Sequence, residues 1–210
     1  MQNGNKWTYT EGVRLMRAKN DAMRTKNGEV LIAFGGNLPC GEMPPTRVLA
    51  LALVALVQGG LTQVSVSRFY ATPCFPAGAG PDYVNAAARF AAPAGLDVLA
   101  LLHQVEARFG RARTARWAGR TLDLDLLAEG DAVRPDLAIW THWHDLDPAT
   151  QARTAPGALI LPHPRLQDRA FVLVPLADVA PDWRHPVLQK TVVQMRDALP
   201  LAEIQAVRPL

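Results

Sequence analysis

Two aspartates, Asp123 and Asp125, stand two residues apart inside an apolar run that extends from Thr121 to Leu127. If this run is a β-strand, residues i and i+2 project from the same face, and the two carboxylates lie side by side. Carboxylates this close repel each other. A hard divalent cation relieves the repulsion, and Mg²⁺ prefers one or two carboxylates together with phosphate oxygens. The spacing therefore indicates a candidate site for a magnesium–phosphate complex.

Arginines gather immediately upstream of the pair, and guanidinium is the group best shaped for two-pronged contact with phosphate. They are Arg108, Arg111, Arg113, Arg116 and Arg120. Taken singly, an Asp-x-Asp pair or an arginine run is commonly just solvated surface. Their coincidence in one short window favours a site for a nucleoside polyphosphate.

Length and composition favour one globular domain. The chain has 210 residues, of which 49% are hydrophobic and 20% charged, as in an ordinary soluble protein. The longest apolar run, Val48 to Val57, is too short to cross a bilayer, and the polar N-terminal residues do not resemble a secretory signal. Cys40 and Cys74 match no metal-ligand spacing and are too few for a disulfide framework. We therefore expect a cytoplasmic protein with no membrane partner.

The net charge of +3 is concentrated near the N-terminus. Residues 1–28 hold six of the 22 basic residues and two of the 19 acidic ones, so the remaining residues carry a balance of −1. This distribution does not favour a nucleic-acid partner. We interpret residues 1–28 as a poorly ordered basic extension, with a helix or a basic arm as alternatives, and residues 29–210 as the functional domain.

Hydrophobic periodicity and turn residues predict the order strand–helix–strand–strand–helix–strand. This is the split βαβ order of ferredoxin-like folds, so we expect an α+β fold in which helices cover an antiparallel sheet. The predicted elements are a strand over 29–34, a helix between Pro44-Pro45 and Gly59-Gly60, strands over 62–70 and 83–90, a helix capped by Asp97 that ends at Gly110, and the Asp-x-Asp strand.

The C-terminal part is less regular. A final short helix is expected near 191–199, and the polar residues 135–157 are expected to form an inserted loop with no assignable role. His142 and His144 with Asp145 could ligate a metal there, but a surface loop with partly packed tryptophans is the favoured interpretation. His163 lies between two prolines that fix its position, although a single histidine is more commonly structural.

Several short motifs follow one another in a recognisable order. They are Gly35-x-Asn37, Phe69-Tyr70-x-Thr72-Pro73, Pro81-Asp82-Tyr83-x-Asn85-Ala86-Ala87, Glu106-x-x-x-Gly110-Arg111-x-Arg113, Arg116-Trp117-x-x-Arg120-Thr121-x-Asp123-Leu-Asp125, Leu161-Pro162-His163-Pro164-Arg165 and Arg169-x-Phe171-Val172-Leu173-x-Pro175-Leu176. In this order they resemble the 6-hydroxymethyl-7,8-dihydropterin pyrophosphokinases of folate biosynthesis. The resemblance spans residues 30–183.

The resemblance implies transfer of a diphosphate group from ATP, the co-substrate, to the pterin hydroxymethyl oxygen, with release of AMP and with two Mg²⁺ ions as cofactors. It implies a monomer that acts on small molecules. The implied metal ligands are Asp123 and Asp125, and the implied catalytic residues are these two with Arg111 and Arg120. The implied ATP-binding residues are His103, Glu106, Arg111, Arg113, Trp117, Arg120, His163 and Arg169. The implied pterin-binding residues are Thr72, Tyr83, Asn85 and Phe171, of which Tyr83 and Phe171 would stack on the pterin.

Two departures from the family pattern concern loops. Gly36 stands where the family usually has serine, and Trp117-Ala118-Gly119-Arg120 replaces Trp-Gly-Pro-Arg.

Two alternative functions stay open at this point. One is another Mg²⁺-dependent transferase that uses a nucleotide, and the other is a non-catalytic ferredoxin-like module that binds a nucleotide or RNA.

Overall fold

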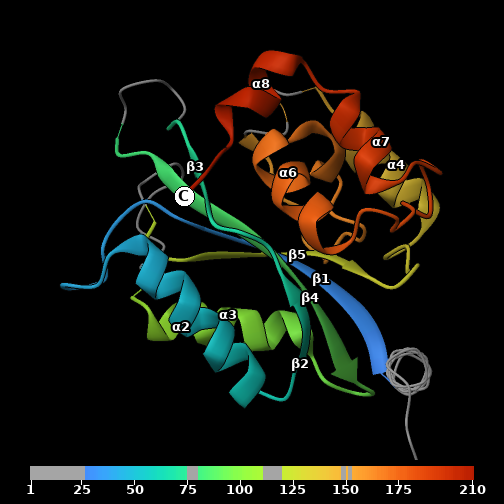
Figure 1. The fold of residues 1–210 in the computed structure, drawn as a ribbon. Helices are drawn as coiled ribbons and strands as arrows, with labels where there is room; N and C mark the ends of the chain where they lie inside the picture. Colours follow the sequence, from blue (N-terminus) through green and yellow to red (C-terminus); the bar gives the residue numbers. More distant parts are fainter. Residues whose placement is uncertain (1–26, 75–79, 111–119, 148–149, 151–152) are drawn as a thin grey trace, which may run out of the picture.

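The computed structural model describes residues 27–74, 80–110, 120–147, 150 and 153–210. In these residues six strands form one antiparallel sheet with the order β5-β1-β4-β3-β6, and β2 also pairs with β4 (Figure 1). The strands are β1 (Asn27–Gly36), β2 (Thr62–Val66), β3 (Tyr70–Thr72), β4 (Tyr83–Pro93), β5 (Asp123–Glu129) and β6 (Arg208–Pro209). The helices are α2 (Pro45–Gln58), α3 (Val98–Arg108), α4 (Leu137–Asp145), α6 (Ala170–Val179), α7 (Val192–Asp197) and α8 (Leu201–Ala206), with a short 3-10 helix at Leu166–Asp168.

The ferredoxin-like prediction is confirmed. Chain order runs β1, α2, β2 with β3, β4, α3, β5, and β1 lies between β4 and β5 in the sheet. Helices α2 and α3 cover one face of the sheet, and α6 with the C-terminal helices covers the other (Figure 1). No helix in the described part of the chain is long and apolar enough to cross a membrane.

The predicted strand over 62–70 is instead two short strands, and local hydrogen bonds explain the break. The Ser67 hydroxyl accepts the backbone N–H of Ala87 (2.9 Å). The backbone N–H of Arg68 donates to the Asp178 carboxylate on α6 (3.2 Å). Ser67 keeps one backbone bond to Ala87 (2.9 Å), but the Ser67 and Asp178 side chains take the place of further ladder partners between Val66 and Tyr70.

The helix boundaries follow the predicted signals. A proline begins α2, and the Asp97 side chain caps α3 by accepting the N–H of Ala100 (3.0 Å). Gly59 ends α2 for reasons of packing, because its φ is −77° and an added Cβ would lie 2.3 Å from a Leu101 methyl carbon. The glycine therefore lets α2 and α3 approach each other closely.

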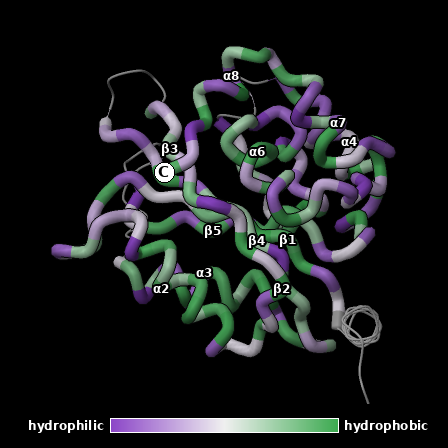
Figure 2. Tube along the Cα trace, in the orientation of Figure 1, coloured by the Kyte–Doolittle hydropathy of each residue, from purple (hydrophilic) through white to green (hydrophobic). Residues whose placement is uncertain are grey.

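Strand β1 is buried on both faces, which explains its continuous apolar run. Ile32 and Phe34 pack with α2 and α3, whereas Leu31 and Ala33 pack with α6 and α7. Many hydrophobic residues lie along these strands and the helices that cover them in Figure 2. The alternation fixes which residues of each neighbouring strand face α6, and this is the face that carries the candidate site.

Residues 135–157 were expected to form a loop, and this prediction is wrong for α4. The Asp136 side chain caps this helix by accepting the N–H of Ile139 (2.9 Å). Trp140 is the buried residue of α4, with 2% of its surface exposed. The sequence did not predict this helix, because only one of its side chains faces the core and a single buried residue produces no apolar stripe.

His185 lies fully buried beside this helix. Its Nδ1 accepts the backbone N–H groups of Val187 and Leu188 (both 3.2 Å). Its ring meets the rings of Trp140 and Trp183 edge-on, at centroid distances of 5.3 and 5.7 Å. Burial, with a smaller contribution from the charge of His144, lowers the pKa of His185 to about 4. The ring is therefore neutral in the folded chain near neutral pH.

This neutrality makes stability depend on pH. Below the ordinary histidine pKa of about 6.5, the unfolded chain binds a proton at this position that the folded chain does not, so the free energy of unfolding falls with pH toward pH 4. We expect His185→Gln to reduce this loss by up to about 3 kcal/mol, measured by urea unfolding at several pH values. His142→Gln, on the exposed side of α4, is the control. Equal pH dependence in His185→Gln and the wild type would contradict the assignment.

Candidate active site

The two aspartates lie at the start of β5 on the same face, as predicted. Leu124 and Leu126, which alternate with them, pack into the core beneath α2 and α3. The Asp123 and Asp125 side chains face the opposite side, where 18% and 36% of their surfaces are exposed. The structure therefore presents two neighbouring carboxylates to a partly open surface.

Two arginines from separate segments meet these carboxylates. Arg120 donates from Nη1 to Asp123 Oδ2, and Arg169 Nη1 lies 3.8 Å from Asp125 Oδ2. Burial alone would lower the pKa of Arg120. The nearby Asp123 and Asp125 carboxylates have the larger combined effect, so the pKa of Arg120 is raised. Burial lowers the pKa of Arg169 by more than Asp125 raises it. Positive charge thus reaches the pair from the loop before β5 and from the residue before α6.

Gly35 stands between the carboxylates and the amide of Asn85. It is opposite Asp123 on β5 and opposite Asn85 on β4, so all three residues share one face. A Cβ at Gly35 would lie 3.1 Å from Asn85 Oδ1 and 4.0 Å from Asp123 Cβ. The glycine therefore lets the Asn85 amide approach β1 closely, beside Asp123.

The predicted pterin residues continue from this space. Asn85 donates from Nδ2 to Thr72 Oγ1 (2.6 Å), and Thr72 is opposite Tyr83 in the β3–β4 pair. Burial raises the pKa of the Tyr83 hydroxyl, with smaller effects from the nearby Arg120, Cys74 and Asp123. Tyr83 therefore lies near both the arginine and the first aspartate.

Phe171 approaches the same site from α6. It occupies the first turn of that helix and has 40% of its surface exposed, which is unusual for a large aromatic side chain. The guanidinium carbon of Arg169 lies 5.7 Å from the centroid of the Phe171 ring. Arg169 therefore links this ring to Asp125. Stacking of a pterin between Phe171 and Tyr83 stays a prediction.

His163 lies beside β5 in the structure, although α4 separates the two in the sequence. Its backbone N–H donates to the carbonyl of Leu127 (2.8 Å), and its Nδ1 accepts the N–H of Arg165 (3.2 Å). Burial, with the charges of Arg169 and Arg165, lowers the pKa of His163 to about 3. Because Nδ1 is an acceptor, the neutral ring carries its proton on Nε2. His163 is therefore a neutral donor.

Glu106 reaches the pair from the opposite face of the sheet. Its carboxylate is 2% exposed, and Oε1 accepts the backbone N–H of Leu124 (2.8 Å), the residue between the two aspartates. His103 lies one turn earlier on α3 and is exposed. Their ATP-binding roles stay predictions, whereas the contact of Glu106 shows that it anchors β5. Arg111, Arg113 and Trp117 lie outside the described residues.

The sequence did not reveal how the Arg120 loop is held. Asn37 Oδ1 accepts the N–H of Arg120 (2.8 Å), and the N–H groups of Asn37 and Leu38 donate to the carbonyl of Arg120 (2.9 and 3.1 Å). Asn37 Nδ2 donates to the carbonyl of Pro81 (3.1 Å). Asn37 belongs to the first motif, but only the structure shows that it joins the ends of three segments.

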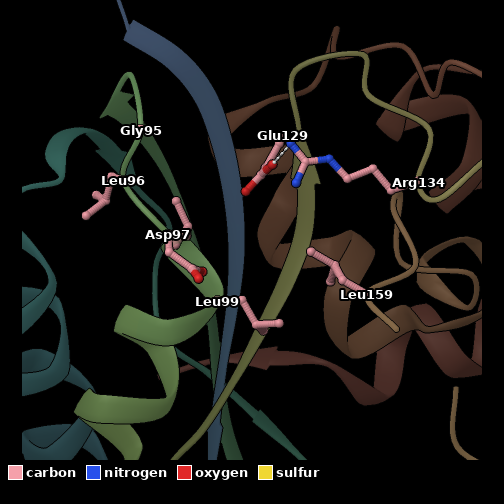
Figure 3. Close-up of a pocket in the computed structure, with 8 residues that line it drawn as sticks. Gly95, Leu96, Asp97, Leu99, Glu129, Arg134 and Leu159 are labelled. Carbon is pink, nitrogen blue, oxygen red and sulfur yellow. Dashed lines mark ion pairs between the residues drawn. The ribbon is translucent and has the colours of Figure 1, made fainter. Parts of the chain in front are cut away.

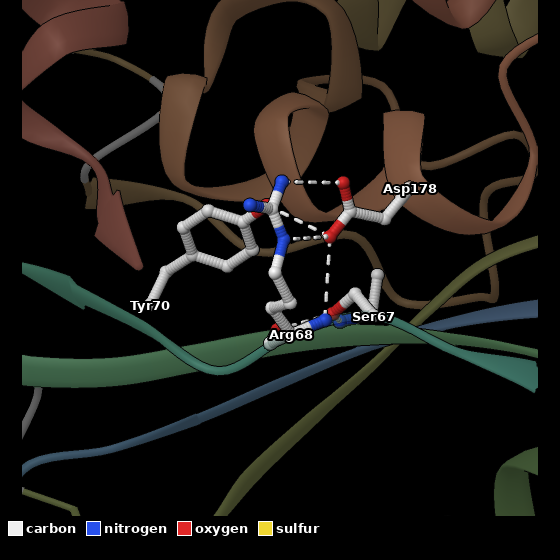
Figure 4. Close-up of polar contacts among 5 residues, drawn as sticks. Ser67, Arg68, Tyr70 and Asp178 are labelled. Carbon is white, nitrogen blue, oxygen red and sulfur yellow. Dashed lines mark hydrogen bonds and ion pairs between the residues drawn. The ribbon is translucent and has the colours of Figure 1, made fainter. Parts of the chain in front are cut away.

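A second unpredicted network ties β3 to α6 (Figure 4). Tyr70 donates from its hydroxyl to Asp178 Oδ2 (2.7 Å), and Arg68 donates to both oxygens of the same carboxylate (3.1 Å each). The buried Tyr70 ring packs with Ala170, the residue before Phe171. The network therefore helps set how far Phe171 stands from the sheet.

A pocket of about 490 Å³ lies elsewhere (Figure 3). Glu129 and Arg134 form an ion pair on its wall (2.8 Å), and Asp97 and Leu99 of the α3 end also line it. Glu129 ends β5, whereas Asp123 begins it, so the pocket lies roughly 20 Å along the strand from the aspartates. It does not belong to the candidate site.

The donor set fits magnesium. Among the described residues, no three His, Cys, Asp or Glu side chains gather into a metal-binding group. This finding does not support a metal at His142, His144 and Asp145. Two partly exposed carboxylates on one face of β5 suit an ion that takes its remaining ligands from phosphate and water.

Comparison with known proteins decides the family. Residues 31–181 match the model of the 7,8-dihydro-6-hydroxymethylpterin-pyrophosphokinase family. The chain belongs to this family. It is similar to the 2-amino-4-hydroxy-6-hydroxymethyldihydropteridine pyrophosphokinase of Synechocystis sp., with 33% identity over 85% of this chain and 80% of that one. The enzyme of the same name from Pseudomonas aeruginosa is 36% identical over 75% of this chain and 83% of its own length.

Solved structures agree on the fold. The HPPK-DHPS A437G variant of Plasmodium falciparum superposes with a TM-score of 0.57 at 13% identity, over 82% of this chain and 45% of that one. This chain therefore spans less than half of that solved chain, and the likeness concerns the fold alone.

The family settles the reaction. As a pyrophosphokinase of folate biosynthesis, the chain transfers diphosphate from ATP to 6-hydroxymethyl-7,8-dihydropterin and releases AMP. ATP is the co-substrate, and Mg²⁺ is the general metal of such kinases. Neither alternative kept open from the sequence is favoured by the homologues.

The Gly36 departure has a structural cause that can be tested. A Cβ at this position would lie 2.7 Å from the backbone carbonyl oxygen of Thr121, so the serine usual in the family would displace the Arg120 loop. We expect Gly36→Ser to lower the free energy of unfolding by about 1–3 kcal/mol and to reduce turnover. Gly28→Ser is the matched control, because nothing lies within 4 Å of its added Cβ. Equal stability of the two variants in urea would contradict the clash.

Proposed function

We propose that diphosphate transfer takes place on the face of the sheet where Asp123, Gly35 and Asn85 stand in one row. The single observation that carries the proposal is this row, since it joins a carboxylate pair to a polar amide across a position with no side chain. The triphosphate of ATP would lie at the carboxylate end, and the pterin at the amide end. The hydroxymethyl oxygen of the pterin would then face the β-phosphorus.

Asp123 and Asp125 are the proposed ligands of two Mg²⁺ ions. When bound, Mg²⁺ neutralises the triphosphate and the charge that develops during transfer. Arg120 and Arg169 face the carboxylates, and we propose that both turn to phosphate oxygens when ATP binds. Their guanidinium groups are suited to this exchange, because carboxylate and phosphate present similar paired oxygens.

His163 is proposed to donate from Nε2 to the triphosphate. Its low pKa supports this role, since a neutral ring can donate a hydrogen bond without changing charge near neutral pH. His103 and Glu106 are proposed for the nucleotide side of the site. For Arg111, Arg113 and Trp117, the sequence motifs alone support the proposal that they bind ATP.

The pterin is proposed to stack between Tyr83 and Phe171, while Asn85 and Thr72 hydrogen-bond its edge. The exposure of Phe171 supports the proposal, because a flat aromatic ligand would cover a ring that is otherwise open to water. The bond between Asn85 and Thr72 fixes the amide orientation, so its Oδ1 and remaining N–H are preorganised for the pterin.

We further propose that the chain works as a monomer in the cytoplasm on these small molecules, without a nucleic-acid or membrane partner. The free thiols of Cys40 and Cys74 support a reducing compartment. The charge balance of −1 over residues 29–210 argues against binding to nucleic acid. In this proposal residues 29–210 form the catalytic domain and residues 1–28 a basic extension, of which the last two, Asn27 and Gly28, already belong to β1.

The metal assignment predicts the effect of removing either charge. Wild-type chain with ATP, Mg²⁺ and the pterin should yield AMP and pterin diphosphate in equal amounts. Asp123→Asn and Asp125→Asn should each lower kcat on the order of 10³-fold, since several kcal/mol of charge stabilisation is lost. Asp131→Asn, an exposed aspartate beyond the far end of β5, should leave kcat unchanged. Release of ADP would contradict the reaction, and wild-type rates in both site variants would contradict the metal assignment.

The stacking role predicts a change that is specific for one substrate. Phe171→Ala should raise KM for the pterin on the order of tenfold, because about 1.4 kcal/mol of ring contact is lost, while KM for ATP stays within about twofold. Phe171→Tyr keeps the ring and should restore most of the affinity for the pterin. The measurement is steady-state kinetics with each substrate varied. Equal losses for both substrates would argue against stacking.

A further inference from the structure

Helix α4 lies outside the motifs that mark the family in this sequence, yet it packs against the segment that carries His163. Its buried residue is Trp140, whose indole Nε1 donates to the carbonyl oxygen of Pro162 (2.8 Å). Pro162 directly precedes His163. A helix with no assigned role thus contacts the backbone beside a proposed ATP ligand.

The contact fixes a single peptide unit from both sides. The carbonyl of Pro162 and the N–H of His163 belong to one planar group. Trp140 donates to the carbonyl oxygen of this group, and the N–H of the same group donates to the carbonyl of Leu127 on β5 (2.8 Å). The preceding residue is held as well, since Leu161 exchanges two backbone hydrogen bonds with Arg134 (2.8 and 3.1 Å). The Pro162–His163 peptide group, from which the His163 side chain projects, is therefore held between α4 and β5.

The indole is itself held in place. It stacks on His144 with a centroid distance of 4.8 Å and an interplanar angle of 23°. His185 meets it edge-on at 5.3 Å, and only 2% of the Trp140 surface is exposed. A buried N–H that lost its acceptor would cost more than an ordinary hydrogen bond contributes. The packing and the hydrogen bond therefore select one position of the indole, and with it one position of the Pro162 carbonyl.

We propose that Trp140 is a positioning residue for His163, and that α4 serves as its support. Trp140 does not touch substrate. It holds the Pro162–His163 peptide so that the neutral imidazole is aligned for the triphosphate before ATP binds. This inference rests on the proposed contact between His163 and ATP, and it gives the inserted segment a role in that same site.

The first test removes the indole donor and keeps an aromatic ring. Trp140→Phe should raise KM for ATP about 5- to 10-fold, because His163 is then no longer preorganised for the triphosphate, while KM for the pterin stays within about twofold. Trp143→Phe is the matched control: it makes the same change on the same helix, where the ring meets His142 at 5.9 Å, and it should leave both constants unchanged. Equal rises in both KM values for Trp140→Phe would overturn the proposal.

A double-mutant cycle separates positioning from general support. If Trp140 acts through His163, adding Trp140→Phe to His163→Ala should not raise KM for ATP further, whereas an additive loss would overturn the proposal. His144→Gln weakens the stack without removing the indole N–H, so it should give a smaller shift that also disappears in His163→Ala. It keeps the test decisive if Trp140→Phe folds poorly.

The same cycle distinguishes two kinds of failure. If His163→Ala leaves KM for ATP unchanged, the ATP contact of His163 is wrong and the positioning role falls with it. If His163→Ala raises KM for ATP while Trp140→Phe and His144→Gln do not, only the positioning role is wrong.

Discussion

Two like charges on adjacent outward positions of one strand repel each other, and the structure depends on how that repulsion is balanced. Asp123 and Asp125 face Arg120 and Arg169, which come from segments on either side of β5 in the sequence. Each arginine can reach the pair only if its own segment is held in place. Asn37 clamps the backbone of Arg120, and the network of Tyr70 and Asp178 docks α6, which follows Arg169, on the sheet. The hydrogen bonds of Asn37 and Tyr70 thus help to keep the two arginines beside the two carboxylates.

Strand register determines what lies beside the charges. Because side chains alternate along a strand, a slip of one residue between β1 and β5 would move Gly35 away from Asp123, and in one direction it would bring Phe34 opposite that carboxylate. The apolar residues of β1 resist such a slip, since Ile32 and Phe34 would leave the core beneath α2 and α3. Glu106 adds a specific tie from α3 to Leu124. The hydrophobic core therefore sets the geometry of the polar site.

Local sequence patterns predicted the elements but not their long-range partners. Period-two alternation placed Asp123 and Asp125 on one face, and a proline and the Asp97 cap marked the starts of α2 and α3. Nothing local indicates that Tyr70 bonds a carboxylate 108 residues away, or that Asn37 binds a backbone 83 residues away. Such contacts arise only when the sheet and its covering helices assemble.

Helix α4 was missed for a related reason. Its single buried residue, Trp140, makes its contact with a backbone carbonyl that lies 22 residues further along the chain. A contact of one side chain with one carbonyl leaves no periodic signal in the sequence. The family motifs identified His163, yet they gave no sign of the residues that hold it. Side chains that support a site are thus harder to find than those within it.

The central claim is that the carboxylates of β5 hold the metal that carries the triphosphate. The most direct measurement is a crystal structure of the chain with a non-hydrolysable ATP analogue, the pterin and Mn²⁺, which takes oxygen ligands as Mg²⁺ does and can be located by anomalous scattering. The account predicts two metal ions, each within about 2.2 Å of carboxylate oxygens of Asp123 or Asp125 and of phosphate oxygens. Metal bound to the phosphates alone, with both aspartates still paired to Arg120 and Arg169, would contradict it.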